Sequence, residues 1–245
     1  MSVRQRLRSE DGYTLIEMVV AAGASLVVAA ATMAILATSY HMLANASDRV
    51  DANQQGRDAL LRVEQLLNSS CVAGLGVSPV VGGSSAGSGA PPSSANSITF
   101  YASQSDSPSA EPNEYVVNLT SGGALDLATY PYQSGSDPDW VFATTASATA
   151  VLVAHAAVTS GASSIFSYYQ YNSTGQLQTD ALVGGYLPSS GAATSNVSAV
   201  TVQFEAVASD NNTSVGNGAD FSDQVVLRLT PVSSTPPTST PEPCS

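Results

Sequence analysis

The chain has no lysine and few positive charges of any kind. Its 245 residues hold seven Lys and Arg together against 19 Asp and Glu, which gives a formal net charge of -12. Three of the arginines lie close to the N-terminus, at Arg4, Arg6 and Arg8. Because phosphate contacts need Lys or Arg, a chain this acidic is a poor general binder of nucleic acid. Charge would not hold it on anionic lipid either, and the acidity favours a soluble, exposed surface.

Side chains that commonly carry catalysis are also scarce. There are two histidines. His41 lies beyond the apolar N-terminal segment, and His155 lies in an apolar, strand-like segment typical of a core histidine. Residues 83–87, GSSAG, match the G-x-S-x-G pattern of a nucleophile elbow, but neither the strand before it nor the helix after it is expected. With no paired acids, metal-ligand cluster or phosphate loop in the sequence, we predict that the protein is not an enzyme.

Formal charge is nearly absent from a long N-terminal segment. Between Tyr13 and Ala37 the one charged residue is Glu17. The segment exceeds the roughly 20 apolar residues that a helix needs to cross a bilayer. Three arginines precede it, which predicts a cytoplasmic N-terminus and a C-terminal bulk outside the cytoplasm.

Three interpretations of this segment compete, and Glu17 separates them. A cleaved signal peptide ending at residues 44–46, ANA, has a much shorter apolar core, of about 7 to 15 residues. A plain single-pass anchor has no use for a carboxylate, which costs roughly 2.5 to 3.5 kcal/mol inside a bilayer. In the third interpretation the chain is cut after Gly12. The new amine on Tyr13 of a neighbouring subunit can then neutralise Glu17 in a helical bundle.

The third interpretation carries a family resemblance. Residues 12–17, GYTLIE, follow a short basic leader and precede an apolar helix, which resembles the type III signal of type IV pilins and pseudopilins. The resemblance implies that a membrane-embedded prepilin peptidase cuts between Gly12 and Tyr13 and methylates the new amine. It also implies that Glu17 sets subunit register during filament assembly. The usual residue after the glycine is Phe, and Tyr13 keeps the aromatic ring.

A second, looser resemblance narrows the family. Residues 54–61, QQGRDALL, together with Cys71 are similar to a Gln-x-x-Arg-x-Ala-Leu pattern in the minor pseudopilins of the PulJ and PilW group. Many amphipathic helices have a similar sequence. The resemblance to this subgroup therefore depends on the cleavage signal at residues 12–17.

The sequence predicts an α+β, pilin-like fold. No proline occurs before Pro79, and one helix is expected from Thr14 to Asn68. Its first half is apolar all round. Its second half carries an apolar stripe that should pack on an antiparallel sheet, with Gly56 as a weak point in the helix. The stripe comprises Ala46, Val50, Leu60, Val63 and Leu67.

Strand signals follow at short intervals. A hairpin is expected around Ser121–Gly123, residues 165–171 are aromatic on both faces and should be central, and the last two strands should pair. The expected strands are residues 97–102, 114–119, 124–129, 148–154, 165–171, 197–207 and 221–230. The expected parts of the chain are a leader (1–12), a transmembrane helix (13–37), its amphipathic continuation (38–70), a flexible loop (71–95), a β-rich head (96–230) and a Pro-rich tail (231–245).

Two further features of the head are candidate sites. Cys71 and Cys244 are the only cysteines, and in an exported chain they suggest one disulfide that ties the tail to the base of the head. Two unpaired thiols are the alternative. The loop after residue 208 is rich in oxygen ligands, including Asp210, Asn212 and Asp220. Its spacing fails the EF-hand pattern, so it is either a weak Ca²⁺ site or an ordinary turn, and no other cofactor is expected.

Two functions therefore remain open at the level of the sequence. The resemblance implies a minor pilin or pseudopilin of a type IV pilus or a type II secretion-like filament, at its tip or in its initiation. It would reside in the inner membrane and then in a filament. Its expected partners are the prepilin peptidase and methyltransferase, other pilins, the inner-membrane assembly platform and, before assembly, membrane lipid. The alternative is an anchored extracellular binding module that never polymerises.

Overall fold

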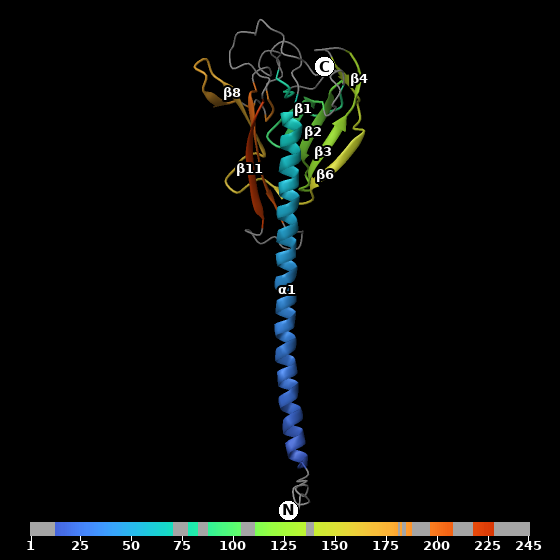
Figure 1. The fold of residues 1–245 in the computed structure, drawn as a ribbon, viewed down its shortest axis with the longest axis vertical. Helices are drawn as coiled ribbons and strands as arrows, with labels where there is room; N and C mark the ends of the chain where they lie inside the picture. The colour runs from blue at the N-terminus through green and yellow to red at the C-terminus, as the bar shows by residue number, and fades with distance from the viewer. Residues whose placement is uncertain are drawn as a thin grey trace, which may run out of the picture. The chain divides into compact units, whose positions relative to one another are not determined.

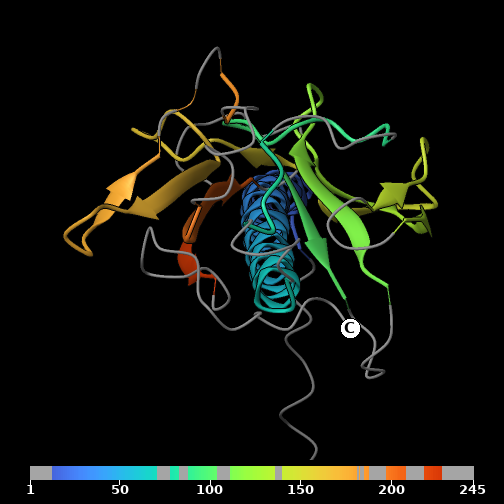
Figure 2. The same cartoon turned by 90° about the horizontal axis from the view of Figure 1, so that it is seen from above.

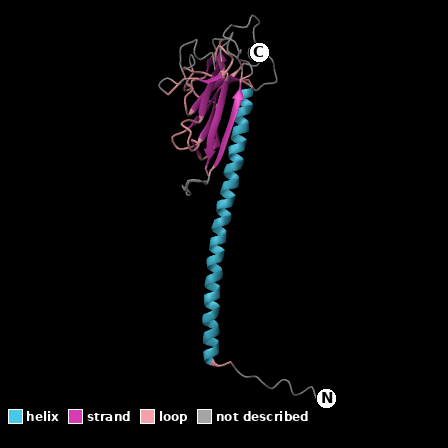
Figure 3. Ribbon diagram, turned by 90° about the vertical axis from the view of Figure 1, so that its left-hand side faces the viewer, coloured by secondary structure: helices cyan, strands magenta, loops and turns pink. Residues whose placement is uncertain are grey.

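The structure is a computed structural model with two compact units. It describes residues 13–70, 78–82, 88–103, 111–135, 140–180, 182, 185–187, 197–207 and 218–227. The first unit spans residues 1–47 and the second spans residues 48–245. Helix α1 (Leu15–Asn68) contributes to both units, and all the strands belong to the second (Figure 3). The chain is therefore α+β, as the sequence predicts.

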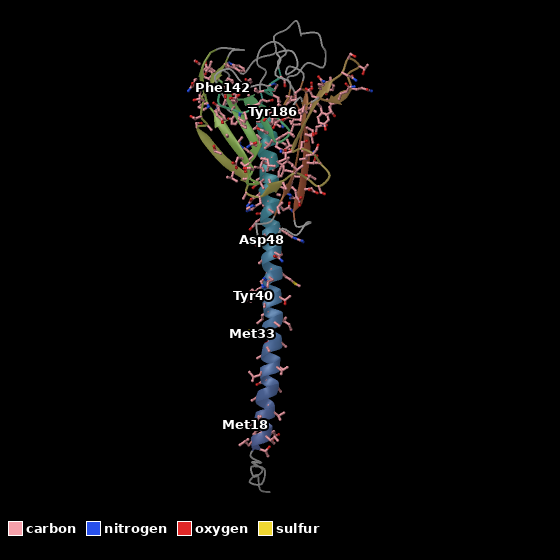
Figure 4. The ribbon with its side chains drawn as sticks, turned by 180° about the vertical axis from the view of Figure 1, so that it is seen from behind. Met18, Met33, Tyr40, Asp48, Phe142 and Tyr186 are labelled. Carbon is pink, nitrogen blue, oxygen red and sulfur yellow. The ribbon has the colours of Figure 1, made fainter. Side chains whose placement is uncertain are left out.

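The first unit is a bare helical segment. Every residue from Tyr13 to Ser47 is exposed, and the side chains of Met18, Met33 and Tyr40 project outward from the helix (Figure 4). Helix formation here needs no tertiary contact, because the segment is rich in good helix formers such as Ala and Leu and has no proline. A helix that is apolar all round belongs in a protein core or a membrane.

The second unit contains two larger antiparallel sheets. The strands lie in the order β1-β2-β3-β6 in the first sheet and β11-β10-β8-β9 in the second, where β7 also pairs with β10. The first sheet comprises β1 (Ser97–Ala102), β2 (Asn113–Leu119), β3 (Leu125–Tyr130) and β6 (Ala148–Val153). The second comprises β7 (Ala156–Ala157), β8 (Phe166–Tyr171), β9 (Leu177–Thr179), β10 (Ala199–Ala206) and β11 (Ala219–Val226). A small third sheet joins β4 (Tyr132–Ser134) to β5 (Val141–Phe142).

Residues 48–68 of α1 lie between the two larger sheets, with β1 and β11 as their neighbours (Figures 1 and 2). The single sheet expected from the sequence is therefore wrong, because strand alternation marks a buried face without saying which strands share a sheet. The inner faces of both sheets and one side of the helix form one core. Its largest fully buried side chains include Tyr168, Phe100, Phe166 and Phe204.

The buried stripe of the helix differs from the expected one. Ala46 and Val50 are exposed, because burial begins only at Ala52. The buried residues of α1 are Ala52, Gly56, Ala59, Val63, Leu66 and Leu67. The start of this stripe is made of small residues, which lets a strand approach the helix closely.

At Gly56 the helix and β11 come close together. A Cβ atom at this position would lie 2.1 Å from Cε2 of Phe221 on β11. The ring of Phe221 stacks on Phe204 of β10, with ring centroids 5.5 Å apart. The glycine that weakens the helix on propensity alone is thus the residue that allows β11 to pack against it.

The next inward-facing residue of β11 brings two acids together. Asp223 lies on the same face of β11 as the buried Phe221 and Val225, and it is hydrogen-bonded to Glu64 of α1. That hydrogen bond, partial burial and the negative charge of Asp223 raise the pKa of Glu64 from 4.5 to about 7. Glu64 therefore keeps its proton up to a higher pH than an isolated glutamate would.

A strap of chain closes the free edge of β1. Val81 N–H donates to the Thr99 carbonyl over 2.8 Å, and Tyr101 N–H donates to the Pro79 carbonyl over 3.0 Å. The Ser93 hydroxyl accepts from Thr99 N–H over 2.9 Å. Because these contacts satisfy the backbone of β1, the strand presents no open edge within the described chain.

The outer face of the first sheet has its own small core. Trp140 and Phe142 pack there with half-buried tyrosines, and the ring of Tyr101 lies edge-on to Trp140 and stacks on Phe142. Glu114, in the cross-strand position next to Tyr101, is fully buried and accepts a hydrogen bond from the Ser88 hydroxyl. This charged residue inside a strand anchors the covering segment to the sheet.

Most of the expected elements are confirmed. The helix begins one residue later than expected and ends at Asn68 as expected. The expected hairpin joins β2 to β3, where Gly123 has a φ of 81° and donates to the Thr120 carbonyl over 3.0 Å. Strand β8 lies between β10 and β9, and β10 pairs with β11. The strands that sequence reasoning missed are β4, β5, β7 and β9, each of two or three residues.

Candidate functional site

The candidate site lies at the start of α1. Gly12 falls outside the described residues, while Tyr13 is 80% exposed and Thr14 precedes the first helical residue. The backbone N–H of Glu17 donates to the Thr14 carbonyl over 3.0 Å and reaches the Thr14 hydroxyl at 3.4 Å. Thr14 is therefore the N-cap of α1, and Glu17 is the third residue of the helix.

This arrangement gives Glu17 a local role that sequence reasoning missed. Threonine at the N-cap with glutamate three positions later is the signature of a capping box, and T-x-x-E is readable at residues 14–17. A carboxylate in the first turn also interacts favourably with the positive end of the helix dipole. The sequence pattern and the helix dipole thus both favour a carboxylate at position 17.

The other polar groups of the apolar segment are satisfied within the helix. The hydroxyls of Ser25 and Thr32 each donate over 2.8 Å to a carbonyl three residues earlier. Those of Thr38 and Ser39 donate to carbonyls four residues earlier, over 3.0 and 2.9 Å. Such back-bonding lets hydroxyls enter an environment without water.

Glu17 differs from these hydroxyl groups. No hydrogen bond or ion pair joins its carboxylate to another residue in the described part of the chain, and the side chain is exposed. In the described chain the carboxylate does not accept the hydrogen bond from the Thr14 N–H that would complete the capping box, and its charge stays uncompensated there. Burying this end of the helix in lipid or protein therefore requires either a proton or a cationic partner.

The helix has the length and composition of a membrane span. Its most apolar 18-residue window has a mean hydropathy of 2.3, and none of that window is buried. The described chain has one such helix, near the N-terminus. It is compatible with a single-pass anchor or with a signal sequence.

The candidate sites of the head are not brought together by the described structure. Cys71, Cys244, Asp210 and Asn212 all lie outside the described residues. Asp220 is exposed on β11, where its cross-strand partner is Glu205 of β10. Within the described residues no group of three or more His, Cys, Asp or Glu side chains is placed to hold a metal ion.

The two histidines occupy unrelated places. His41 is exposed on the helix of the first unit. His155 lies half-buried between β6 and β7, and its backbone carbonyl accepts a hydrogen bond from Val207 N–H over 2.8 Å. His155 is therefore less enclosed than the core histidine that the sequence predicts, and it lies where the apolar segment divides into two strands.

The features that remain for function are a capped, charged helix start, an exposed apolar helix and a head built around the continuation of that helix. No family model, curated protein or solved structure matches the chain.

Proposed function

We propose that the chain is a minor pilin or pseudopilin, a structural subunit that is inserted in the membrane, cut between Gly12 and Tyr13 and then built into a filament. The observation that carries the proposal is the order of residues 12–17 at the start of a helix whose first part, up to Ser47, is largely apolar and fully exposed. A helix of this kind needs lipid first and other helices afterwards.

Glu17 supplies the assembly chemistry in this proposal. Cleavage places a new amine on Tyr13, four residues from Glu17 and at the same end of the helix. Between two subunits the amine of one chain neutralises the carboxylate of the other, and the attraction is stronger in a helical bundle than in water. An unmatched carboxylate there is costly, so the pairing favours one register of packing.

The capping interaction favours a second candidate function. If Glu17 serves only as the third residue of a capping box, a partner subunit is not needed to explain it. The chain would then be an anchored extracellular binding module that does not polymerise. The two functions make different predictions for the same pair of variants.

The deciding variants are Glu17→Gln and Thr14→Ala. Glutamine keeps the capping box but removes the charge, so Glu17→Gln should leave the chain in the membrane and abolish its recovery in filaments sheared from cells. Thr14→Ala is the matched control, because it removes the cap and keeps the carboxylate. It should cost about 1 kcal/mol of helix stability and leave filament recovery close to wild type.

The opposite pattern would reject the proposal. Wild-type recovery of Glu17→Gln in the sheared fraction would mean that the charge of Glu17 is not used in assembly. Absence of the wild-type chain itself from the sheared fraction would favour the anchored module. Equal amounts of both variants in washed membranes control for expression and insertion.

A further inference from the structure

Strand β6 is an open edge of the first sheet. It ends the order β1-β2-β3-β6, and its only strand partner within the described chain is β3 (Figure 1). Ala148, Thr149, Ala150 and Val151 are all exposed, and Val151 is 62% exposed. An uncovered strand presents a row of backbone N–H and C=O groups that another strand can pair with.

The other sheet edges are protected in ways that β6 is not. Residues 79–81 cover β1, and β9 has only three residues. Strand β11 carries Asp220 and Asp223, and charges on an edge strand oppose pairing with another chain. Strand β6 has six residues, none charged and none proline.

Strand β6 lies in an uncharged stretch of an acidic chain, although its neighbour β3 carries one acid, Asp126, opposite Val151. Residues 141–179 contain no Asp, Glu, Lys or Arg, although the whole chain has a net charge of -12. Two such chains repel each other over most of their surface. They can approach with least repulsion where this uncharged segment reaches a sheet edge, which it does at β6 and at the three-residue β9, and β6 is the longer of the two.

The register of β6 limits how much of it can pair. Asp126 is opposite Val151 and Leu125 is opposite Val153, so Leu152 is an extra residue at an irregularity. A bulge bends the edge and ends regular pairing there. The usable part is Ala148–Val151, whose small, uncharged side chains place nothing bulky or repulsive across an antiparallel pair.

We propose that β6 is a self-association edge, at which two copies of this chain join their first sheets by antiparallel pairing of Ala148–Val151. The occupant is a second copy, because two β6 edges can pair without placing one charged strand residue opposite another, although the chains are acidic. The inference does not rest on the proposed function, since an anchored monomer and a filament subunit would both carry this edge.

The test compares two exposed valines on two edge strands. Val151→Lys places a charge at the proposed interface, and Val226→Lys makes the same change on β11, where the valine is 47% exposed. Sedimentation of the full chain in detergent should show a concentration-dependent dimer for the wild type and for Val226→Lys. Val151→Lys should raise the dissociation constant at least about tenfold, because a charged side chain on an edge strand opposes pairing with another strand.

Two further measurements separate this edge from other routes to a dimer. Amide hydrogen exchange at residues 148–151 should slow as the wild-type concentration rises, while exchange in β11 should not change. Added salt should strengthen the dimer by screening the repulsion between acidic heads. A wild-type chain that stays monomeric at every concentration, or a dimer equally populated in Val151→Lys, would overturn the proposal.

Discussion

The two parts of helix α1 have the same backbone and opposite surroundings. From Leu15 to Ser47 every side chain is exposed, and the polar groups there are satisfied by the helix itself. From Asp48 to Asn68 one side of the helix is buried, and small residues are placed where a strand comes close. The first part therefore packs against nothing in the described chain, whereas the second part is already packed in the head.

Apolar side chains have two different roles within this one helix. Leu26 and Val27 of the first part are each 71% exposed, whereas Leu66 and Val63 of the second part are fully buried. An apolar side chain of the second part therefore stabilises the folded head. One of the first part can contribute only when the helix enters a membrane or packs against other helices. The experiments that follow use pairs of matched substitutions, one in each part.

The largest difference is expected for Leu66→Ala against Leu36→Ala. Leu66 is fully buried in the core, so its truncation should lower the free energy of unfolding of the head by about 2 to 5 kcal/mol. Leu36 is half exposed in the first part, and its truncation should change the same quantity by less than about 0.5 kcal/mol. Urea unfolding followed by the fluorescence of Trp140, the only tryptophan, reports on the head alone. Equal effects of the two variants would show that the two parts unfold as one unit.

A smaller difference is expected for Gly56→Ala against Gly23→Ala. A methyl group on Gly56 would collide with the ring of Phe221, so overpacking should cost about 1 to 3 kcal/mol. At Gly23 a Cβ atom meets nothing within 4 Å, and alanine there should raise helix stability by up to about 1 kcal/mol without affecting the head. Thermal unfolding of the head in detergent distinguishes the two. A stabilised Gly56→Ala head would contradict the close contact between α1 and β11.

The smallest effect concerns the raised pKa of Glu64 beside Asp223. Because the pKa of Glu64 is about 7 in the folded head and near 4.5 when unfolded, the folded state binds more protons between these values. Head stability should therefore fall as the pH rises from about 4.5 to about 7, and change little from this source outside that window.

Glu64→Gln isolates this contribution to the pH dependence. Glutamine can donate a hydrogen bond to Asp223 at every pH, so the difference in stability between wild type and variant should itself depend on pH, and most steeply below 7. Parallel stability curves for the two proteins from pH 4.5 to 7.5 would show that the two acids are not coupled. The matched variant of the first part, Glu17→Gln, should leave the pH dependence of the head unchanged.

The sequence predicts the helix and the long strands because their signals are local. The absence of proline before Pro79 and the continuous apolar run determine α1, and Gly123 marks the hairpin between β2 and β3. The two- and three-residue strands carry too few side chains for a recognisable period. Division of the strands into two sheets depends on contacts between distant segments, which alternation along one strand does not encode.

The buried stripe of α1 shows a second limit of prediction from the sequence. Val50 is apolar and correctly spaced, yet it is exposed, because nothing in its own segment says where the sheets begin. Gly56 is buried because of Phe221, more than 160 residues away along the chain. At the candidate site the capping pattern of Thr14 and Glu17 is local, so the sequence alone could have predicted it. The family resemblance concerns the charge of Glu17 and does not predict the cap.

The central claim is that the chain is processed at the start of its apolar helix and then uses that start for assembly. The most direct measurement is the intact mass and N-terminal peptide of the full chain recovered from membranes of cells that have a prepilin peptidase. The account predicts a mature chain that begins at Tyr13, with a methyl group on its amine. A chain that begins at Ser47, after cleavage at residues 44–46, or that keeps its first 12 residues, would contradict it.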